Sequence, residues 1–75
     1  MYHITVIYAD QSFREYDHVN KIDFYAGSAF KTLEGDAIIS HHYTLGNMTY
    51  HLFSEDGVAS VYVQNAVSFE VYKES

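Results

Sequence analysis

Apolar and polar side chains alternate along most of this chain, a pattern typical of β-strands that bury one face. The alternation is clear between Tyr2 and Tyr8, where every second residue is apolar or aromatic and His3 and Thr5 lie between them. Residues that favour turns interrupt the pattern at short intervals. The sequence therefore predicts an antiparallel β-meander.

The predicted strands share this alternation and are separated by polar or glycine-containing turns. They are Tyr2 to Tyr8, Phe13 to Tyr16, a strand with Ile22 and Phe24 inward and Lys21, Asp23 and Tyr25 outward, Ala37 to Leu45, Met48 to Phe53, Val58 to Val63, and Ala66 to Tyr72. Turns are expected at Asp10 to Ser12, Asp17 to Asn20, Gly46-Asn47, Ser54 to Gly57 and Gln64-Asn65. We expect an all-β fold of six or seven antiparallel strands, forming a small barrel or a two-layer sandwich in one domain, residues 1–75.

Residues 26 to 37 allow two interpretations. Ser28 could cap a short helix over Ala29 to Glu34 that stops at Gly35. Alternatively, Gly27-Ser28 and Gly35-Asp36 are turns on either side of a strand at Phe30 to Leu33. The strand is favoured, because so short a helix is marginal in water without strong packing.

Three histidines and two tyrosines surround Gly46-Asn47 in the stretch ISHHYTLGNMTYHL, residues 39 to 52. A tight two-residue hairpin there would pair Leu45 with Met48 and, further along, His42 with His51. In that register, His42 and His51 are direct neighbours on a polar face. The other face would carry Ile39, Tyr43, Leu45, Met48, Tyr50 and Leu52, and His41 would point toward this apolar side.

The pair of His42 and His51 is the candidate metal site of the sequence. Two imidazoles could share a zinc or nickel ion, but a structural zinc site needs four ligands and a catalytic site needs three and a water molecule. Ser40 and the threonines of the hairpin do not complete such a set, so a solvated polar face is the favoured interpretation and no cofactor is expected. His3 and His18 are interpreted as single histidines without a functional role.

The chain is short, with 75 residues and no cysteine, so its core must be thin and cannot be reinforced by disulfides. Aromatic residues make up 17% of the sequence. Large aromatic side chains or self-association are the expected supplements to the core. The absence of cysteine and of a recognisable secretory signal favours a cytoplasmic location.

The charge balance argues against two classes of partner. Ten acidic residues oppose four basic ones, which gives a formal net charge of −6, and the basic residues are spread singly along the chain. Binding to nucleic acid phosphates or to anionic lipid requires a basic patch. We therefore expect no direct nucleic-acid binding and, because no long apolar run occurs, no membrane-spanning segment.

No motif for an enzyme is present. There is no cysteine nucleophile, no Gly-x-Ser-x-Gly elbow and no phosphate-binding glycine loop. The adjacent carboxylates of Glu55 and Asp56 fit a turn, where such residues serve the backbone. The sequence therefore predicts a protein that is not an enzyme.

Tyrosines supply the main signal for function. Tyr16, Tyr25, Tyr62 and Tyr72 fall on or beside outward positions, and tyrosine gives a large contact area with a polar tip. They fit either cross-strand pairs that stabilise a thin sheet or an interaction surface. The general look is similar to small β-proteins of Gram-positive bacteria and their phages, although no motif identifies a family.

Three functions follow as hypotheses. The first is a non-enzymatic protein-interaction module, an accessory protein of a bacterium or phage, that binds another protein through an aromatic β-face and could form a homodimer. The second is an acidic decoy that blocks a nucleic-acid-binding protein. The third is a metal-binding or pH-sensing module based on His42 and His51.

Overall fold

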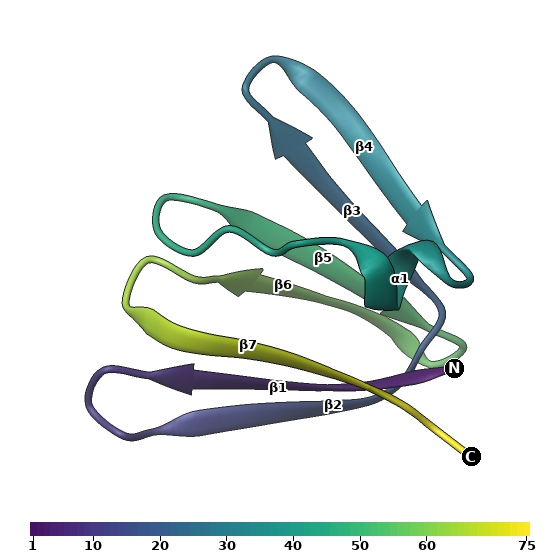
Figure 1. Cartoon of the computed structure of the whole chain (residues 1–75), viewed down its shortest axis with the longest axis horizontal. Coiled ribbons are helices and arrows are strands. Elements are labelled where there is room, and N and C mark those ends of the chain that lie inside the picture. Colours follow the sequence, from purple (N-terminus) through teal and green to yellow (C-terminus); the bar gives the residue numbers. More distant parts are fainter.

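Two antiparallel β-sheets form the computed structural model, which describes all residues from Met1 to Ser75 (Figure 1). The strands are β1 (Tyr2–Tyr8), β2 (Phe13–Val19), β3 (Lys21–Ala26), β4 (Ala29–Glu34), β5 (Thr49–Ser54), β6 (Gly57–Tyr62) and β7 (Ala66–Lys73), and one short helix, α1, spans Ala37–Ser40. The three-stranded sheet has the order β2-β1-β7, and the four-stranded sheet has the order β4-β3-β5-β6. The predicted all-β, seven-stranded, two-layer fold is confirmed, and the sheets do not close into a barrel.

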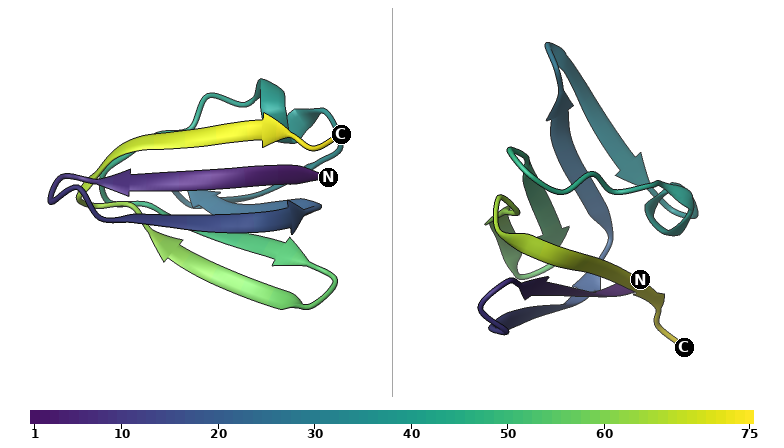
Figure 2. Two further views of the ribbon diagram at one scale, coloured as in Figure 1. Left: turned by 90° about the horizontal axis from the view of Figure 1, so that it is seen from below. Right: turned by 60° about the vertical axis from the view of Figure 1, so that its left-hand side comes forward.

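The strand order departs from a simple meander at two places. The hairpins β1–β2, β3–β4 and β5–β6 follow the chain, but β3 also pairs with β5, and β7 pairs with β1. The first and last strands therefore lie side by side (Figure 2). The predicted turn at Gln64-Asn65 exists, but it leads from one sheet to the other rather than closing a hairpin.

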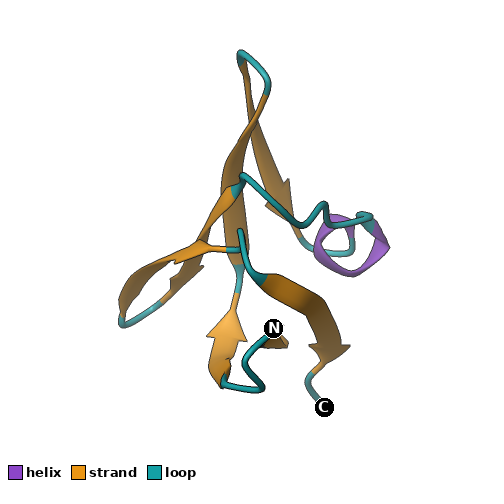
Figure 3. Cartoon of the chain, turned by 90° about the vertical axis from the view of Figure 1, so that its left-hand side faces the viewer, coloured by secondary structure: helices purple, strands orange, loops and turns teal.

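The core lies between the inner faces of the sheets. It contains eleven buried residues and no buried polar side chain: Tyr2, Ile4, Val6, Val19, Ile22, Phe24, Ile38, Tyr50, Leu52, Val61 and Val63. Strand β2 contacts β5 on one side, and α1 contacts β4 and β7 on the other (Figure 3). With only four residues, α1 is far too short to cross a membrane, and there is no other helix.

Aromatic rings enlarge this thin core. The ring of Tyr50 lies 5.2 Å from that of Phe24, 5.1 Å from that of Phe69 and 5.4 Å from that of Tyr43, between centroids. Tyr43 in turn stacks on Phe69 at 4.5 Å. Such tilted, edge-on and offset contacts add stabilisation beyond the buried area alone. The expectation that heavy aromatic side chains supplement the core is confirmed.

The predicted strand from Ala37 to Leu45 is wrong. Residues Ala37–Ser40 form α1, and the chain beyond it is irregular up to β5. Ile38 is fully buried, whereas Ile39 is exposed, which reverses the predicted orientation of these two side chains. The hydroxyl of Tyr50 accepts from the backbone N–H of Thr44 and donates to its carbonyl, so a side chain satisfies groups that a strand would pair with a neighbour.

The predicted turn from Asp17 to Asn20 is also wrong. Strand β2 continues to Val19, and only Asn20 separates it from β3. The polar residues that suggested a turn belong to a β-bulge, where the register against β1 shifts by one and His18 has a φ of 58°. A bulge and a turn favour the same residue types, because both use left-handed backbone.

Residues 26 to 37, for which the sequence allowed a helix or a strand, contain strand β4, which confirms the favoured interpretation. Strand β4 pairs with β3 along its whole length, from Lys21 opposite Glu34 to Ala26 opposite Ala29. Gly27 takes a φ of +65° in the connecting turn, a conformation that glycine adopts without strain. In Figure 1 this hairpin rises away from the rest of the molecule, which exposes its tip to solvent.

Candidate functional site

The predicted pair of His42 and His51 does not form. Strand β5 pairs with β3 and β6, so the cross-strand neighbours of His51 are Asp23 and Ser60. The ring Nδ1 of His51 is hydrogen bonded to Ser60 Oγ at 2.7 Å. His42 is exposed in the irregular segment before β5. The predicted cross-strand pairing of His42 with His51 is therefore wrong.

Backbone pairing of the loop explains this outcome. The N–H of Gly46 donates to the carbonyl of Val63, and the N–H of Val63 donates to the carbonyl of Met48. The loop is thus held by the chain that follows β6, not by the residues that precede the loop. A tight turn at Gly46-Asn47 would instead have paired Met48 with Leu45, the residue before the turn.

His41 points inward, as predicted. Its ring lies 5.1 Å from that of Phe24 and 4.9 Å from that of Tyr43. Burial lowers the pKa of His41, and the neighbouring charge of His42 lowers it further. His41 is therefore a packing residue that favours its neutral form.

The four candidate tyrosines do not share one surface. Tyr16, on β2, is half-buried against the core. Tyr72 lies on the three-stranded sheet, where its hydroxyl donates to Glu70 Oε1 at 2.8 Å. Tyr25 and Tyr62 are both exposed on the four-stranded sheet, on the side that faces away from the core. Only these last two belong to one face.

This outer face is defined by the residues of the four-stranded sheet whose neighbours along each strand point into the core. From β4 through β3 and β5 to β6, its members are Phe30, Thr32 and Glu34; Tyr25, Asp23 and Lys21; Thr49, His51 and Phe53; and Tyr62, Ser60 and Val58. Cross-strand partners point to the same side, so two rows cross the whole sheet, one from Glu34 to Val58 and one from Thr32 to Ser60. Strands β3 and β5 pair only from Lys21 to Asp23, so the remaining residues form two separate pairs, Phe30 with Tyr25 and Thr49 with Tyr62.

Apolar side chains occupy both ends of the outer face. At one end, Tyr25 and Phe30 pack edge-on with centroids 5.0 Å apart, and both are exposed. At the other end, the ammonium of Lys21 lies 4.3 Å above the ring of Phe53, beside exposed Val58. Phe53 itself is half-buried, whereas Tyr25, Phe30 and Val58 are open to solvent.

The middle row is polar and consists of Thr32, Asp23, His51 and Ser60. Asp23 is half-buried, and its Oδ1 has no hydrogen-bond donor within the chain. Asp23, His51 and Ser60 have the residue types of a catalytic triad, but no hydrogen bond joins Asp23 to His51. A triad is recognised by that geometry, which is absent here.

Substituting Asp23 by threonine should stabilise the fold by about 1 kcal/mol. The change removes an acceptor without a partner and introduces a residue that favours strands. Urea denaturation of the two proteins measures the difference. A loss of stability would mean that Asp23 has a stabilising partner in solution, and Asp23→Asn would then show whether its charge is needed.

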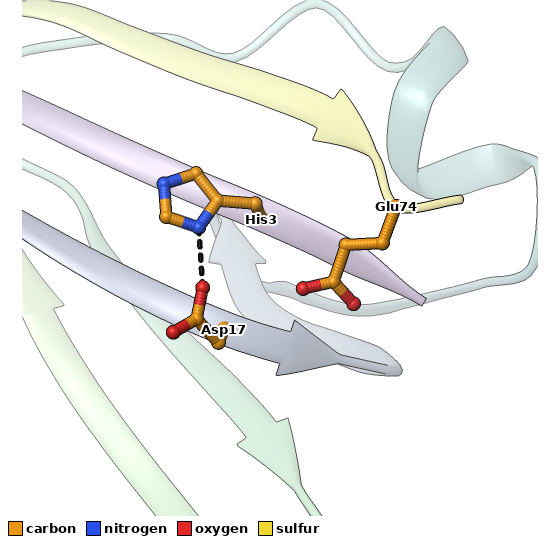
Figure 4. Close-up of side chains that lie close together, drawn as sticks. All are labelled: His3, Asp17 and Glu74. Carbon is orange, nitrogen blue, oxygen red and sulfur yellow. Dashed lines mark hydrogen bonds and ion pairs between the residues drawn. The ribbon is translucent and has the colours of Figure 1, made fainter.

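A second group of side chains gathers on the outer side of the three-stranded sheet. His3 Nδ1 lies 2.6 Å from Asp17 Oδ1, the contact drawn in Figure 4, and His3 Nε2 lies 3.2 Å from Glu15 Oε1. The protonated ring donates to carboxylates from both nitrogens. Thr5 Oγ1 is a further neighbour of Nε2, at 3.2 Å. A ring that donates from both nitrogens is in its charged form.

Glu74 reaches the same place from the end of β7. Its Oε2 accepts from the backbone N–H of His18, and its Oε1 pairs with His18 Nδ1, both at 3.1 Å. One donor atom each from His3, Asp17 and Glu74 lie within 4.8 Å of one another. We refer to His3, Glu15, Asp17, His18 and Glu74 as the His3 cluster.

Hydrogen bonds shift two pKa values in the His3 cluster. The hydrogen bond that His3 donates to Asp17 raises the pKa of His3; desolvation opposes this, and the charge of Asp17 and the contacts with Glu15 reinforce it. For Glu74, desolvation acts to raise the pKa, but the hydrogen bonds from the backbone and ring of His18 outweigh it and lower the pKa. Both shifts favour the charged forms.

The His3–Asp17 pair predicts a pH dependence. Because the pKa of His3 is raised in the folded state, its stabilisation is fully present below the ordinary value of 6.5 and is lost as the pH rises through the raised pKa. Asp17→Asn should therefore lower the free energy of unfolding at mildly acidic pH and change it little above the pKa of His3. Urea denaturation of both proteins across this pH range tests the prediction. A difference in the free energy of unfolding that stays constant with pH would contradict it. His41 titrates in both proteins, so its effect cancels. The charge of Asp17 also acts on the pKa of Glu74, which lies below its ordinary value of 4.5, so the two proteins are compared above that pH.

The sequence interpretation missed the His3 cluster. His3 and His18 were expected to have no partners of functional interest, yet the structure places both among carboxylates. Alternation along β1 does indicate that His3 faces outward with Thr5. The pairing of β1 with β7 and the bulge in β2 complete the cluster, and neither has a local signal in the sequence.

Comparison with known protein families, with curated proteins and with solved structures found no match to this chain.

Proposed function

We propose that this protein is a small, non-enzymatic module that binds one protein partner through the outer face of the four-stranded sheet. The observation that carries the proposal is the set of exposed apolar and aromatic side chains on that face, with a polar row between its ends. They are Phe30, Tyr25 and Tyr62 at one end and Val58 at the other. Contiguous apolar groups left exposed on a small protein mark interaction sites. Aromatic anchors combined with hydrogen-bonding groups are typical of protein interfaces.

Charge favours a partner other than a second copy of this chain. Each molecule carries a formal charge of −6, so two copies repel each other. A partner with basic groups around an apolar centre would be attracted instead. A stable homodimer is the competing arrangement, and sedimentation equilibrium at high micromolar concentration should show a monomer if the partner is a different protein.

Substituting both tyrosines of the outer face should abolish capture of the partner. Tyr25 and Tyr62 are 60% and 53% exposed, so Tyr25→Ser and Tyr62→Ser remove contact area without opening the core. Loss of two aromatic anchors should weaken binding by about 100-fold. The matched control is Tyr72→Ser, since Tyr72 is 54% exposed on the other sheet.

The measurement is quantitative affinity capture from host extract with the wild-type chain, the double variant and the control. A protein retained by the wild type and by Tyr72→Ser, but lost with the double variant, supports the proposal. Equal retention by all three chains would refute binding through the outer face. Titration calorimetry with the purified partner then gives the change in Kd.

An acidic decoy for a nucleic-acid-binding protein is the second candidate. It is favoured by the gathering of carboxylates on the three-stranded sheet, where Glu15 and Glu70 both pair across from Thr5, near Asp17 and Glu74. A decoy should compete with DNA for its partner and lose affinity steeply as salt rises. Binding that is insensitive to salt, or that is lost with the tyrosine variants only, supports the module instead.

We also place this protein in the cytoplasm of a bacterium or in a cell infected by a phage, and this part of the proposal depends on sequence composition alone. Fractionation of the native host with an antibody against the chain tests it. Recovery of the chain outside the cytoplasmic fraction would contradict it.

A further inference from the structure

We propose that the His3 cluster binds one divalent transition-metal ion of the zinc type. The site lies on the three-stranded sheet, away from the outer face, and shares no residue with the proposed protein interface. The donors are the ring nitrogen of His3 and carboxylate oxygens of Asp17 and Glu74, with His18 beside Glu74. Imidazole nitrogen and carboxylate oxygen are ordinary zinc ligands.

The positions of the donors suit a single ion. Bonds of about 2.0–2.2 Å place the ligands of one tetrahedral zinc roughly 3.4 Å apart. The three donor atoms already lie within 4.8 Å of one another, and His3 Nδ1 and Asp17 Oδ1 are 2.6 Å apart. The ion would have to separate that pair slightly and draw Glu74 inward. Figure 4 shows the carboxylate of Glu74 extending from the end of β7 beside the pair.

Further donors are close enough to complete the coordination. His18 Nδ1 lies 3.1 Å from Glu74 Oε1, so rotation of this exposed ring supplies a fourth ligand. Glu15, bonded to the other nitrogen of His3, would then orient the ring from behind. An oriented imidazole with a carboxylate on its second nitrogen is the usual support for a metal-bound histidine.

The charge around the cluster supplies an independent observation. Three carboxylates, those of Glu15, Asp17 and Glu74, converge there, yet none pairs with a lysine or arginine. The only ion pairs in the chain are those made by His3 and His18 within this cluster. A proton on histidine is therefore the only positive charge paired with these carboxylates, and a divalent ion that displaces it neutralises them more completely.

The placement of the donors gives the ion a structural consequence. His3 is on β1, Asp17 on β2, and Glu74 follows β7, so one ion would tie all three strands of this sheet together at the end where the two termini lie (Figure 1). An ion that binds only the folded chain stabilises it by mass action. Zinc in about 100-fold excess over its Kd should raise Tm by about 10 °C or more.

Titration of the metal-free full chain with Zn²⁺ tests the proposal directly. We expect one ion per chain by calorimetry and shifts of the His3 and His18 ring resonances, while those of His42 and His51 stay in place. Binding should weaken as the pH falls, because protons compete for the imidazole nitrogens. Unchanged His3 and His18 resonances at stoichiometric zinc would overturn the proposal.

Two isosteric variants localise the ion. Glu74→Gln and Asp17→Asn should each weaken zinc binding by more than tenfold, and the double variant should bind none at the concentrations used. Glu70→Gln is the matched control, since Glu70 lies on the same side of the sheet but accepts hydrogen bonds from Ser68 and Tyr72 instead. Zinc binding that survives the double variant, or that falls equally with Glu70→Gln, would place the ion elsewhere and overturn the assignment.

Discussion

Replacing Tyr50 by alanine is expected to lower the free energy of unfolding by about 4 kcal/mol. Tyr50 is fully buried, and its ring contacts those of Phe24, Tyr43 and Phe69. A chain of this length has a total stability of roughly 4–11 kcal/mol, so the variant should be largely unfolded or close to it. Urea denaturation followed by circular dichroism measures the loss.

Two further variants separate the causes of this effect. Tyr50→Phe keeps the ring and removes only the hydroxyl that bonds to both backbone groups of Thr44, which should cost about 1–2 kcal/mol. Tyr62→Ala removes an exposed tyrosine and should cost less than about 0.5 kcal/mol. A similar loss for Tyr50→Ala and Tyr62→Ala would contradict the position of Tyr50 at the centre of the core.

Ile38→Ala is expected to lower the free energy of unfolding by about 3 kcal/mol. Ile38 is the only buried residue of α1 and is fully enclosed where the helix contacts β4 and β7. The neighbouring Ile39 is 44% exposed, so Ile39→Ala should cost less than about 1 kcal/mol. Chemical denaturation of the two variants gives a matched comparison of adjacent isoleucines.

A larger loss of stability for Ile39→Ala than for Ile38→Ala would contradict the helix α1. In the hairpin that the sequence suggested, Ile39 faces the core and its neighbour Ile38 faces solvent. A large loss for Ile39→Ala and a small one for Ile38→Ala would therefore support a strand from Ala37 to Leu45. The sign of the difference in free energy of unfolding between the two variants therefore distinguishes the helix from the strand.

The local alternation of apolar and polar residues was sufficient to predict a strand that has one buried face and a partner close in sequence. It predicted β1 and the inward direction of Ile22 and Phe24, because both depend on side-chain period alone, whereas the mostly exposed β4 was favoured only because so short a helix is marginal. It failed from Ala37 to Met48, where the same alternation fits a hairpin. There, the buried Ile38 and the bonds from Tyr50 to Thr44 decide the path of the chain.

The candidate sites follow the same division. Tyr25 and Tyr62 were correctly placed outward, but their presence on one face depends on the order β4-β3-β5-β6, which no local signal encodes. The pairing of His42 with His51 failed with the hairpin that it required. The His3 cluster combines three distant strands and a bulge at His18, so it could be recognised only after the register was known.

The central claim, that the outer face binds a protein, is tested most directly by mapping the interface on the isotopically labelled chain with the captured partner. We predict that chemical-shift changes will concentrate on Tyr25, Phe30, His51 and Tyr62, with the Tyr72 side of the molecule unchanged. Changes concentrated at Tyr72 and the His3 cluster, with the four-stranded sheet unaffected, would contradict the claim.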